Sequence, residues 1–288
     1  MVWARWLFRL RAPILMTRHN TKPVRFHFFN RLLYRRGIDR LVLVSSAALE
    51  NYRRFFDAGI LNASAIPIIH SCIDLERFAK PPCSARIRAE LGIGNDTPLI
   101  GLIGRVSKDK GHLVLLEAIP QILTEFPDAV FIFVGKEGKR VGPMVRDIIA
   151  RRGLQKSVRL LHFREDIVDI TAALDVSVLP ATGTDSSPAV LKEALLLGKP
   201  VVASRIAGLP EIVSDEAGIL VTPGSATELA QAIVTTLRDG KKRSGPAREL
   251  PERFTPRVMS NAYLGVYDEI RRRGERYEAR LRGRGGIE

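Results

Sequence analysis

The chain has 288 residues, of which 45% are hydrophobic and 26% charged, a composition typical of folded globular proteins that excludes a disordered or fibrous chain. Its formal net charge of +14 lies at the two ends. Residues 1–78 carry 13 Lys and Arg against 5 Asp and Glu, residues 238–288 carry 14 against 8, and residues 79–237 carry 18 of each. The neutral middle and the lack of an aromatic-basic motif argue against nucleic acid as a partner.

The basic ends make an anionic membrane surface the better candidate partner. Residues 26–36 combine aromatic, leucine and arginine side chains in the pattern of a basic amphipathic stretch. An equally good interpretation is a helix packed on its own domain with solvated arginines. No apolar run reaches the roughly 18 residues that span a membrane. Arg5, Arg9 and Arg11 interrupt the apolar core of a signal-like N-terminus, so we do not interpret it as a signal peptide.

Two cysteines, Cys72 and Cys83, are too few for a disulfide framework and have no CxxC partner. We therefore expect reduced intracellular thiols. This favours a cytoplasmic protein, with a peripheral position at the inner face of the membrane as an open alternative.

Short apolar runs alternate with longer helical patterns along the chain, as expected for βαβ units around a parallel sheet. The predicted strands are 14–17, 40–45, 65–69, 99–103, 130–134, 158–161, 176–179, 200–203 and 218–221. The predicted helices are 84–91, 111–126, 144–152, 167–173, 188–197, 206–213, 226–237 and 257–272. The fold class is therefore α/β, and several strands are continuous Val, Ile and Leu runs typical of strands buried on both faces.

The pattern divides the chain into four parts. Residues 1–78 supply about three strands, and residues 98–240 supply a six-stranded doubly wound unit. A proline pair and a polar run place a linker at 79–97. Residues 241–288 contain a further linker, a helix returning towards the first domain, and a basic tail whose end we expect to be unstructured.

The first candidate site is the segment GRVSKDKG, Gly104 to Gly111, between a predicted strand and a helix. Ligands of open α/β sheets bind at such positions. Arg105 and Lys110 can converge on one anion, as the leaving diphosphate of a nucleotide sugar requires. The alternative interpretation is a solvent-exposed basic turn without a ligand, which would contain the same residues.

The second candidate site is the segment from Thr182 to Ala194, again after a predicted strand. Ser186 or Ser187 can cap a helix whose first turn holds Pro188, so that free N–H groups near Ala189 and Val190 face a bound phosphate. Two carboxylates, Asp185 before the helix and Glu193 inside it, could accept hydroxyls at opposite ends of one ligand. A surface charge is the plain alternative for Glu193, but its apolar neighbours require a partner for a carboxylate there.

The third is AGLPEIV, residues 207–213, in which Glu211 could be no more than a helix-start carboxylate. In order and spacing, the three segments resemble the retaining glycosyltransferases called group 1 or family four. That family has a GR(L/V)xxxKG loop, an E-x7-E motif before AxGxPVVAS, and a closing GxxEIVxxxxxGxLVxPxD. The present chain has GRVSKDKG, then Asp185 and Glu193 with seven residues between them before LLLGKPVVAS, then AGLPEIVSDEAGILVTPGS.

The resemblance implies a GT-B-like architecture and a role for each matching residue. Arg105 and Lys110 would bind the donor diphosphate and stabilise it as it leaves, with Gly104 opening the loop. Glu193 would hold the ribose hydroxyls. Asp185 matches the position that contacts the transferred sugar, where the family usually has the longer Glu. The backbone at Phe163 and Arg164 matches the segment lining the base pocket.

The first 78 residues continue the resemblance. PILMTRHN resembles the strand end PxVxTxH, in which a histidine, here His19, reaches the sugar and donor phosphate. The family's acceptor-side domain begins with a glycine-rich loop and roughly eighty to a hundred further residues, the size expected of one half of a doubly wound pair. Because this chain starts near that domain's fourth strand, we expect a misplaced or truncated start, or a degenerate relative. An incomplete sheet would expose an unpaired edge and favour poor solubility or dimerisation.

The resemblance implies transfer of a hexose or heptose from a nucleoside-diphosphate sugar to a glycan or lipid-linked acceptor with retention, in cell-envelope glycan synthesis. The donor is a substrate, so no cofactor is implied. No metal is implied either, because the sequence has no Asp-x-Asp pair. Two alternatives stay open: an epimerase of the same fold, and a fragment that binds the nucleotide sugar without catalysis.

Overall fold

The computed structural model describes residues 12–214, 217–239 and 252–284, with side chains described up to residue 272. The predicted linker after residue 239 and most of the glycine-rich tail lie outside these residues. So does the signal-like segment up to residue 11. The described chain forms two units, one of residues up to Cys72 together with those from Arg253 onward, and one of residues 73–252.

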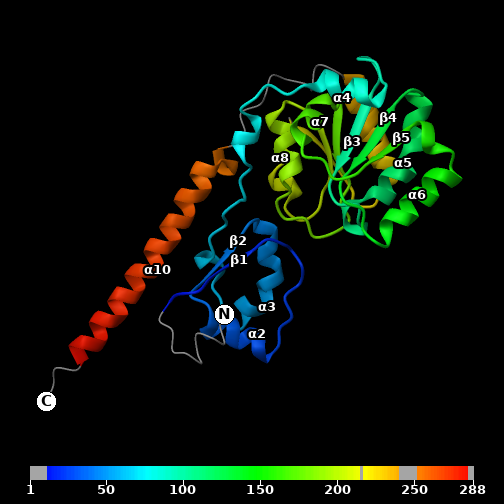
Figure 1. Ribbon diagram of the computed structural model, residues 1–288. Helices are drawn as coiled ribbons and strands as arrows, with labels where there is room; N and C mark the ends of the chain where they lie inside the picture. The colour runs from blue at the N-terminus through cyan, green and yellow to red at the C-terminus, as the bar shows by residue number, and fades with distance from the viewer. Residues whose placement is uncertain (1–11, 215–216, 240–251, 285–288) are drawn as a thin grey trace. The chain divides into compact units, whose positions relative to one another are not determined.

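The first unit has a two-stranded parallel sheet of β1 (Leu15–Arg18) and β2 (Arg40–Leu43). Its helical segments are α2 (Phe28–Leu32), a π-helical turn at Leu33–Gly37, a 3₁₀ segment at Ser46–Tyr52, α3 (Arg53–Asp57) and the long α10 (Pro256–Arg284) (Figure 1). The fully buried rings of Tyr52 and Phe55 lie in the hydrophobic core of this unit. From α10, Val266 and Ile270 pack on the opposite side of β2.

The second unit is a six-stranded parallel sheet in the order β5-β4-β3-β6-β7-β8. Its strands are β3 (Leu99–Ile103), β4 (Val130–Val134), β5 (Val158–Leu161), β6 (Val176–Leu179), β7 (Val201–Ser204) and β8 (Gly218–Val221). Every residue of β3, β4, β6 and β7 is buried, because helices cover both faces of the sheet.

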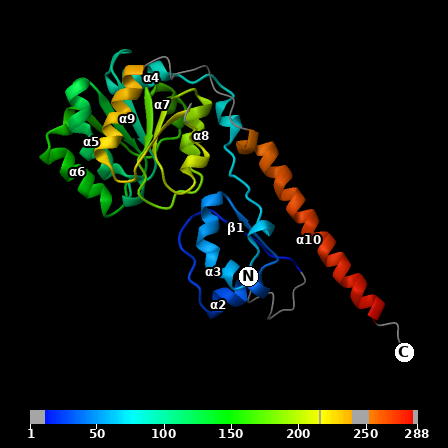
Figure 2. The same cartoon turned by 180° about the vertical axis from the view of Figure 1, so that it is seen from behind.

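The helices of this unit are α4 (Ser84–Leu91), α5 (His112–Glu125), α6 (Val141–Arg151), α7 (Ile167–Ala173), α8 (Ala189–Leu196) and α9 (Ala226–Asp239). One face of the sheet packs against α5, α6 and α9, and the other against α4 and α7 (Figures 1 and 2). Short 3₁₀ turns of this unit lie at Leu75–Phe78, Lys108–Lys110, Leu154–Lys156 and Leu209–Glu211. Two others are Ala63–Ala65 in the first unit and Glu252–Phe254, where the chain passes from the second unit to the first.

Two predicted elements are wrong. The strand expected at 65–69 is reduced to one parallel bridge between Ile68 and Leu43, and its first residue, Ala65, ends the 3₁₀ turn Ala63–Ala65. The helix expected at 206–213 is only the 3₁₀ turn Leu209–Glu211, since Pro210 stands at its start and Ala207 adopts a positive φ of 51°. The remaining predicted strands and helices form within a few residues of their expected bounds, except that the helix expected at 257–272 continues to Arg284 as α10.

Candidate functional site

The strand order of the second unit reverses between β3 and β6, which are neighbours in the sheet. In an open parallel sheet the loops leaving two such strands run to opposite faces and leave a crevice at their carboxyl ends. The GRVSKDKG segment follows β3, and the segment that begins at Thr182 follows β6. The fold therefore places the two strongest sequence motifs at the position where sheets of this kind bind ligands.

The two loops contact each other closely. The Thr182 amide donates to the Asp109 carbonyl at 3.0 Å, and the Thr182 hydroxyl donates to the Lys108 carbonyl at 3.0 Å. Gly111 has a φ of +76°, and a Cβ on it would lie 1.7 Å from the Pro180 carbonyl oxygen, so only glycine fits. The loops thus meet backbone to backbone.

This contact brings two predicted site residues together. The Lys110 ammonium forms an ion pair with the Asp185 carboxylate, and both side chains are about one-fifth exposed. Spacing along the chain does not reveal the pair, because 75 residues separate its members.

The third motif joins the same place through its backbone. The Gly208 amide donates to the Asp185 carbonyl at 3.1 Å. The preceding residue, Ala207, is the one described non-glycine residue with a positive φ. Backbone strain of this kind is held only where the surroundings fix it, and it is common at ligand sites. All three motifs therefore converge on Asp185.

Sequence reasoning missed a fourth loop, residues 135–138, which follows β4. The Val106 amide donates to the Lys136 carbonyl at 3.0 Å, and the Gly138 amide donates to the Val106 carbonyl at 2.9 Å. A Cβ on Gly135 would lie 2.4 Å from the Gly104 carbonyl oxygen. The sequence contains a signal for this loop, because Gly135 and Gly138 closely follow the apolar run of β4.

Arg105 and its neighbours make the first loop electropositive. Arg105 is exposed, while Lys110 is half-buried. Burial alone would raise the pKa of Asp109, but hydrogen bonds from Ser107 and its own amide, and the charges of Lys110 and Arg105, lower it overall. The loop therefore holds an ionised Asp109 among three cations, Arg105, Lys108 and Lys110, and keeps a net positive charge.

Glu193 is buried, with only 6% of its surface exposed. Its Oε1 accepts from Arg77 Nη1 at 3.0 Å, a contact across 116 residues. Burial raises the pKa of Glu193, and the charges of Arg77 and Lys192 oppose that rise. The expectation that this carboxylate needs a partner is confirmed, but Arg77 was missed because no local pattern connects it to the motif.

The predicted serine cap of α8 is wrong. Pro188 occupies the N-cap position with an extended ψ of 128°, and no side chain caps the helix. The Ser187 hydroxyl instead accepts from the fully buried Lys192 ammonium at 2.7 Å, because that cation needs an acceptor inside the protein. The Ser186 hydroxyl is buried without a hydrogen-bond partner. Ala189 is exposed and Val190 is half-buried, so the first N–H groups of α8 lie near the protein surface.

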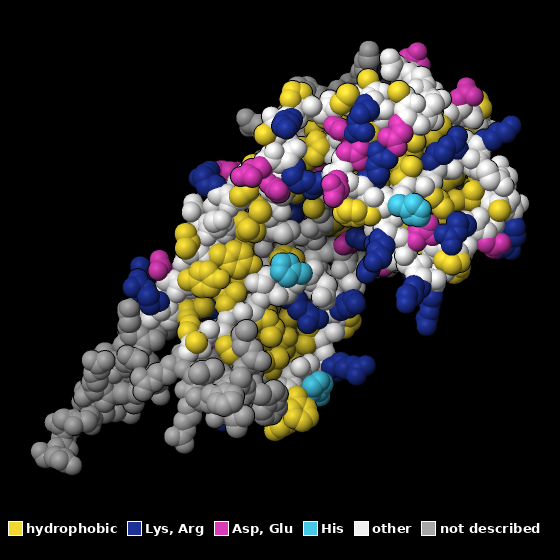
Figure 3. All heavy atoms as spheres, viewed as in Figure 1, with side chains coloured by type: hydrophobic (Ala, Val, Ile, Leu, Met, Phe, Trp, Pro, Cys, Tyr) yellow, Lys and Arg dark blue, Asp and Glu magenta, His cyan; other side chains and the backbone are white. Residues whose placement is uncertain are grey.

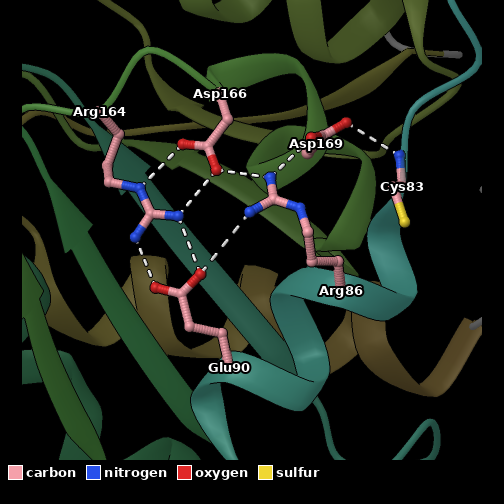
Figure 4. Close-up of polar contacts among 6 residues, drawn as sticks. All are labelled: Cys83, Arg86, Glu90, Arg164, Asp166 and Asp169. Carbon is pink, nitrogen blue, oxygen red and sulfur yellow. Dashed lines mark hydrogen bonds and ion pairs between the residues drawn. The ribbon is translucent and has the colours of Figure 1, made fainter.

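The segment at Phe163 and Arg164 follows β5 and is fastened to α4 (Figure 4). The Arg164 guanidinium donates to Asp166 at 2.7–2.8 Å and to Glu90 Oε2 at 2.9 Å. Arg86 extends the network to Asp166 at 2.6 Å and Asp169 at 2.7 Å, and the Cys83 amide donates to Asp169. Phe163 itself is 73% exposed, so its ring faces solvent beside the Arg164 ion pairs.

The remaining predicted residue, His19, is exposed directly after β1 in the first unit. Among the residues that the structure describes, no group of three or more His, Cys, Asp or Glu could hold a metal ion. The same residues contain no helix long and apolar enough to cross a membrane.

Comparison with known proteins identifies the family. Residues 97–239 match the family described as Glycosyl transferases group 1. The chain belongs to the group 1 glycosyltransferases. This group 1 chain is 30% identical over 244 residues to the D-inositol 3-phosphate glycosyltransferase of Saccharomonospora viridis, covering 80% of the chain and 56% of that relative. It therefore spans little more than half the length of this relative.

A further relative is a GDP-mannose-dependent phosphatidylinositol monomannoside mannosyltransferase of Corynebacterium glutamicum, 26% identical over 72% of the chain and 55% of that protein. Among solved structures, Alr3699/HepE of Anabaena in complex with UDP-glucose has 26% identity and a TM-score of 0.79, covering 93% of the group 1 chain and 75% of the other. The GT-B fold class expected from the sequence is confirmed by this likeness.

Proposed function

We propose that this chain contains the donor site of a retaining glycosyltransferase that moves a sugar from a nucleoside diphosphate to an acceptor hydroxyl. The Lys110–Asp185 ion pair at the switch point of the sheet carries the proposal. In a nucleotide sugar the transferred ring and the diphosphate share one oxygen atom. A cation for the phosphate and a carboxylate for the sugar must therefore be neighbours, as these two are.

The residues around this pair supply the other functions that the transfer needs. When the bond between the anomeric carbon and the phosphate oxygen breaks, its electrons remain on the diphosphate, and Lys110 with Arg105 stabilises the added charge. The amino end of α8, which follows Pro188, adds the N–H groups of Ala189 and Val190 and the helix dipole. Asp185 accepts hydroxyls of the transferred sugar, Glu193 accepts the ribose, and the backbone at residues 163–164 lines the base. We assign His19 to the sugar and the donor phosphate, as its match to the family's strand-end histidine implies.

For the acceptor, we propose a class from the names of the relatives and from the surface of the first unit. The names of the inositol-phosphate and phosphatidylinositol-linked relatives suggest an acceptor with an anionic group, in the synthesis of envelope glycans or glycolipids. In the first unit, Phe28 and Phe29 are 68% and 62% exposed, beside a shallow pocket whose lining includes Arg31, Arg35 and Arg36. Exposed aromatic rings with arginines suit an anionic membrane surface.

The second unit differs from the basic first unit in its surface charge, because residues 79–237 carry equal numbers of acidic and basic residues. On the face in view, Figure 3 shows acidic side chains interspersed with basic ones over the second unit. A donor-binding fragment without catalysis, or an epimerase acting on the same donor, would use the same loops. Product analysis separates these alternatives, because transfer or hydrolysis releases the nucleoside diphosphate, an epimerase yields an isomeric nucleotide sugar, and a binding fragment yields neither.

Calorimetric titration with UDP, GDP and their glucose and mannose conjugates tests the proposal. Lys110→Ala should weaken binding of the preferred nucleoside diphosphate about 10–100-fold, the loss expected for one charge-assisted hydrogen bond. Lys156→Ala is the matched control, since Lys156 is exposed just before β5, at the other edge of the sheet. Asp185→Asn should weaken the sugar conjugate more than the free nucleotide. Unchanged binding in Lys110→Ala would refute the site.

A further inference from the structure

Arg77 lies in a short turn that precedes α4. Asp74 caps this 3₁₀ turn, Leu75–Phe78, by accepting from the Glu76 amide at 3.1 Å. From the turn, the Arg77 side chain reaches Glu193 Oε1 at 3.0 Å. The Arg77 side chain is 39% exposed and the Glu193 side chain is 8% exposed. The contact therefore runs from the protein surface to a buried carboxylate in α8.

Glu193 occupies an unfavourable place for a negative charge. Its neighbours Leu191, Ala194 and Leu195 are buried in the hydrophobic core. Burial raises the pKa of Glu193, and the two charged groups that lower it are Arg77 first and then Lys192. Lys192 donates to the Ser187 hydroxyl, so its ammonium is already engaged elsewhere. Arg77 is thus the principal group that opposes this rise in pKa and favours the ionised carboxylate.

The contact with Arg77 uses only part of the hydrogen-bonding capacity of Glu193. A carboxylate has two oxygens with about four acceptor positions, and Arg77 Nη1 contacts Oε1. The other acceptor positions suit a pair of vicinal hydroxyls, because each hydroxyl donates one hydrogen bond to an ionised carboxylate. A protonated Glu193 would lose charge-assisted bonding to such a diol.

We propose that Arg77 is a positioning residue for nucleotide recognition, which holds the Glu193 carboxylate ionised and in one orientation to accept the 2′ and 3′ hydroxyls of a ribonucleotide. This inference rests on the proposed function, since it takes Glu193 as the ribose ligand. It adds a specificity to it: the site distinguishes ribose from deoxyribose through an arginine that does not touch the ligand. A merely structural tether between the 75–78 turn and α8 would give no such discrimination.

The test compares the full chain with Arg77→Gln, Arg77→Lys and the control Arg238→Gln. Arg238 forms an exposed ion pair with Glu125 at 2.6 Å, which joins α9 to α5. Dissociation constants are measured between pH 5 and pH 8 for UDP or GDP, whichever the chain binds, and for the matching 2′-deoxynucleotide. Circular dichroism confirms that each variant is folded.

We expect Arg77→Gln to weaken ribonucleotide binding about tenfold and the deoxynucleotide much less. The pH below which ribonucleotide binding falls should move upward, because removing Arg77 raises the pKa of Glu193 further. Arg77→Lys, which keeps the charge, should retain most of the wild-type pH profile, and Arg238→Gln should match wild type throughout.

Equal loss for both nucleotides with an unmoved pH profile would overturn the inference and leave a structural tether. If Arg77→Gln does not fold, Arg77→Lys decides: the inference fails if this variant, while staying folded, loses affinity equally for the ribonucleotide and the 2′-deoxynucleotide. Binding of neither nucleotide by the wild-type chain would instead refute the proposed function, and this inference with it.

Discussion

Gly111→Ala is the substitution that tests the site geometry most directly. Gly111 ends the first loop with a φ of +76°, and an alanine Cβ there would lie 1.7 Å from the Pro180 carbonyl oxygen. A left-handed conformation costs a residue with a Cβ about 1–2 kcal/mol. The overlap adds the cost of forced overpacking, about 1–3 kcal/mol. The Pro180 carbonyl belongs to the backbone just after β6 and cannot rotate away as a side chain would.

The expected loss of stability is therefore about 2–5 kcal/mol for the unit of residues 73–252. For a unit of this size, 1 kcal/mol corresponds to about 2–4 °C in Tm, so thermal unfolding should show a decrease of about 4–20 °C. Moving the loops apart also separates Lys110 from Asp185. Nucleotide binding by the folded fraction should consequently weaken in the same variant.

Gly153→Ala is the matched control. Gly153 also has a left-handed φ, +67°, but no atom lies within 4 Å of the position its Cβ would take. It should lose only the conformational cost and leave nucleotide binding unchanged. If Gly111→Ala proved no more harmful than Gly153→Ala, the close contact between the two loops would be refuted.

Three further predictions concern the second unit. Arg88→Met should cost about 1–3 kcal/mol in urea unfolding, because it removes the nearly buried guanidinium that donates to the carbonyls of Gly94, Thr97 and Ala173 and to the part-exposed Asp175 carboxylate; a loss below about 1 kcal/mol would contradict this. Burial lowers the pKa of His112 to about 4, so the unfolded chain binds a proton between pH 6.5 and 4 that the folded chain does not. The free energy of unfolding should therefore fall by about 3 kcal/mol as the pH is lowered through that range. His112→Leu should remove this part of the pH dependence when thermal melting is measured at several pH values. The Arg164 guanidinium holds the pKa of Asp166 far below its usual range, which adds stability above the unfolded pKa that is lost as pH falls. Arg164→Gln should therefore begin acid unfolding at a higher pH than wild type, and coincident acid transitions would count against the network.

The sequence by itself determined the sheet of the second unit and the location of its motifs. Val130–Val134 is a run of branched and aromatic residues that is stable as a strand only when covered on both faces, and the structure buries all five residues. Because the carboxyl ends of parallel strands share one edge, motifs following successive strands had to lie at that edge. Periodicity and motif order therefore sufficed for the architecture and for placing Lys110 and Asp185 in one region.

Only the tertiary structure decided which side chains pair within that region. Ser187 is a good helix cap by local preference, yet it accepts from Lys192 because the fold buries that lysine completely. Residues 206–213 have a helical pattern that the backbone at Ala207 interrupts. Arg77 and Glu193 are 116 residues apart, and their contact depends on how a turn before α4 lies against α8. Propensity and periodicity describe neighbours along the chain, whereas desolvation makes a buried charge select a partner by its position in space.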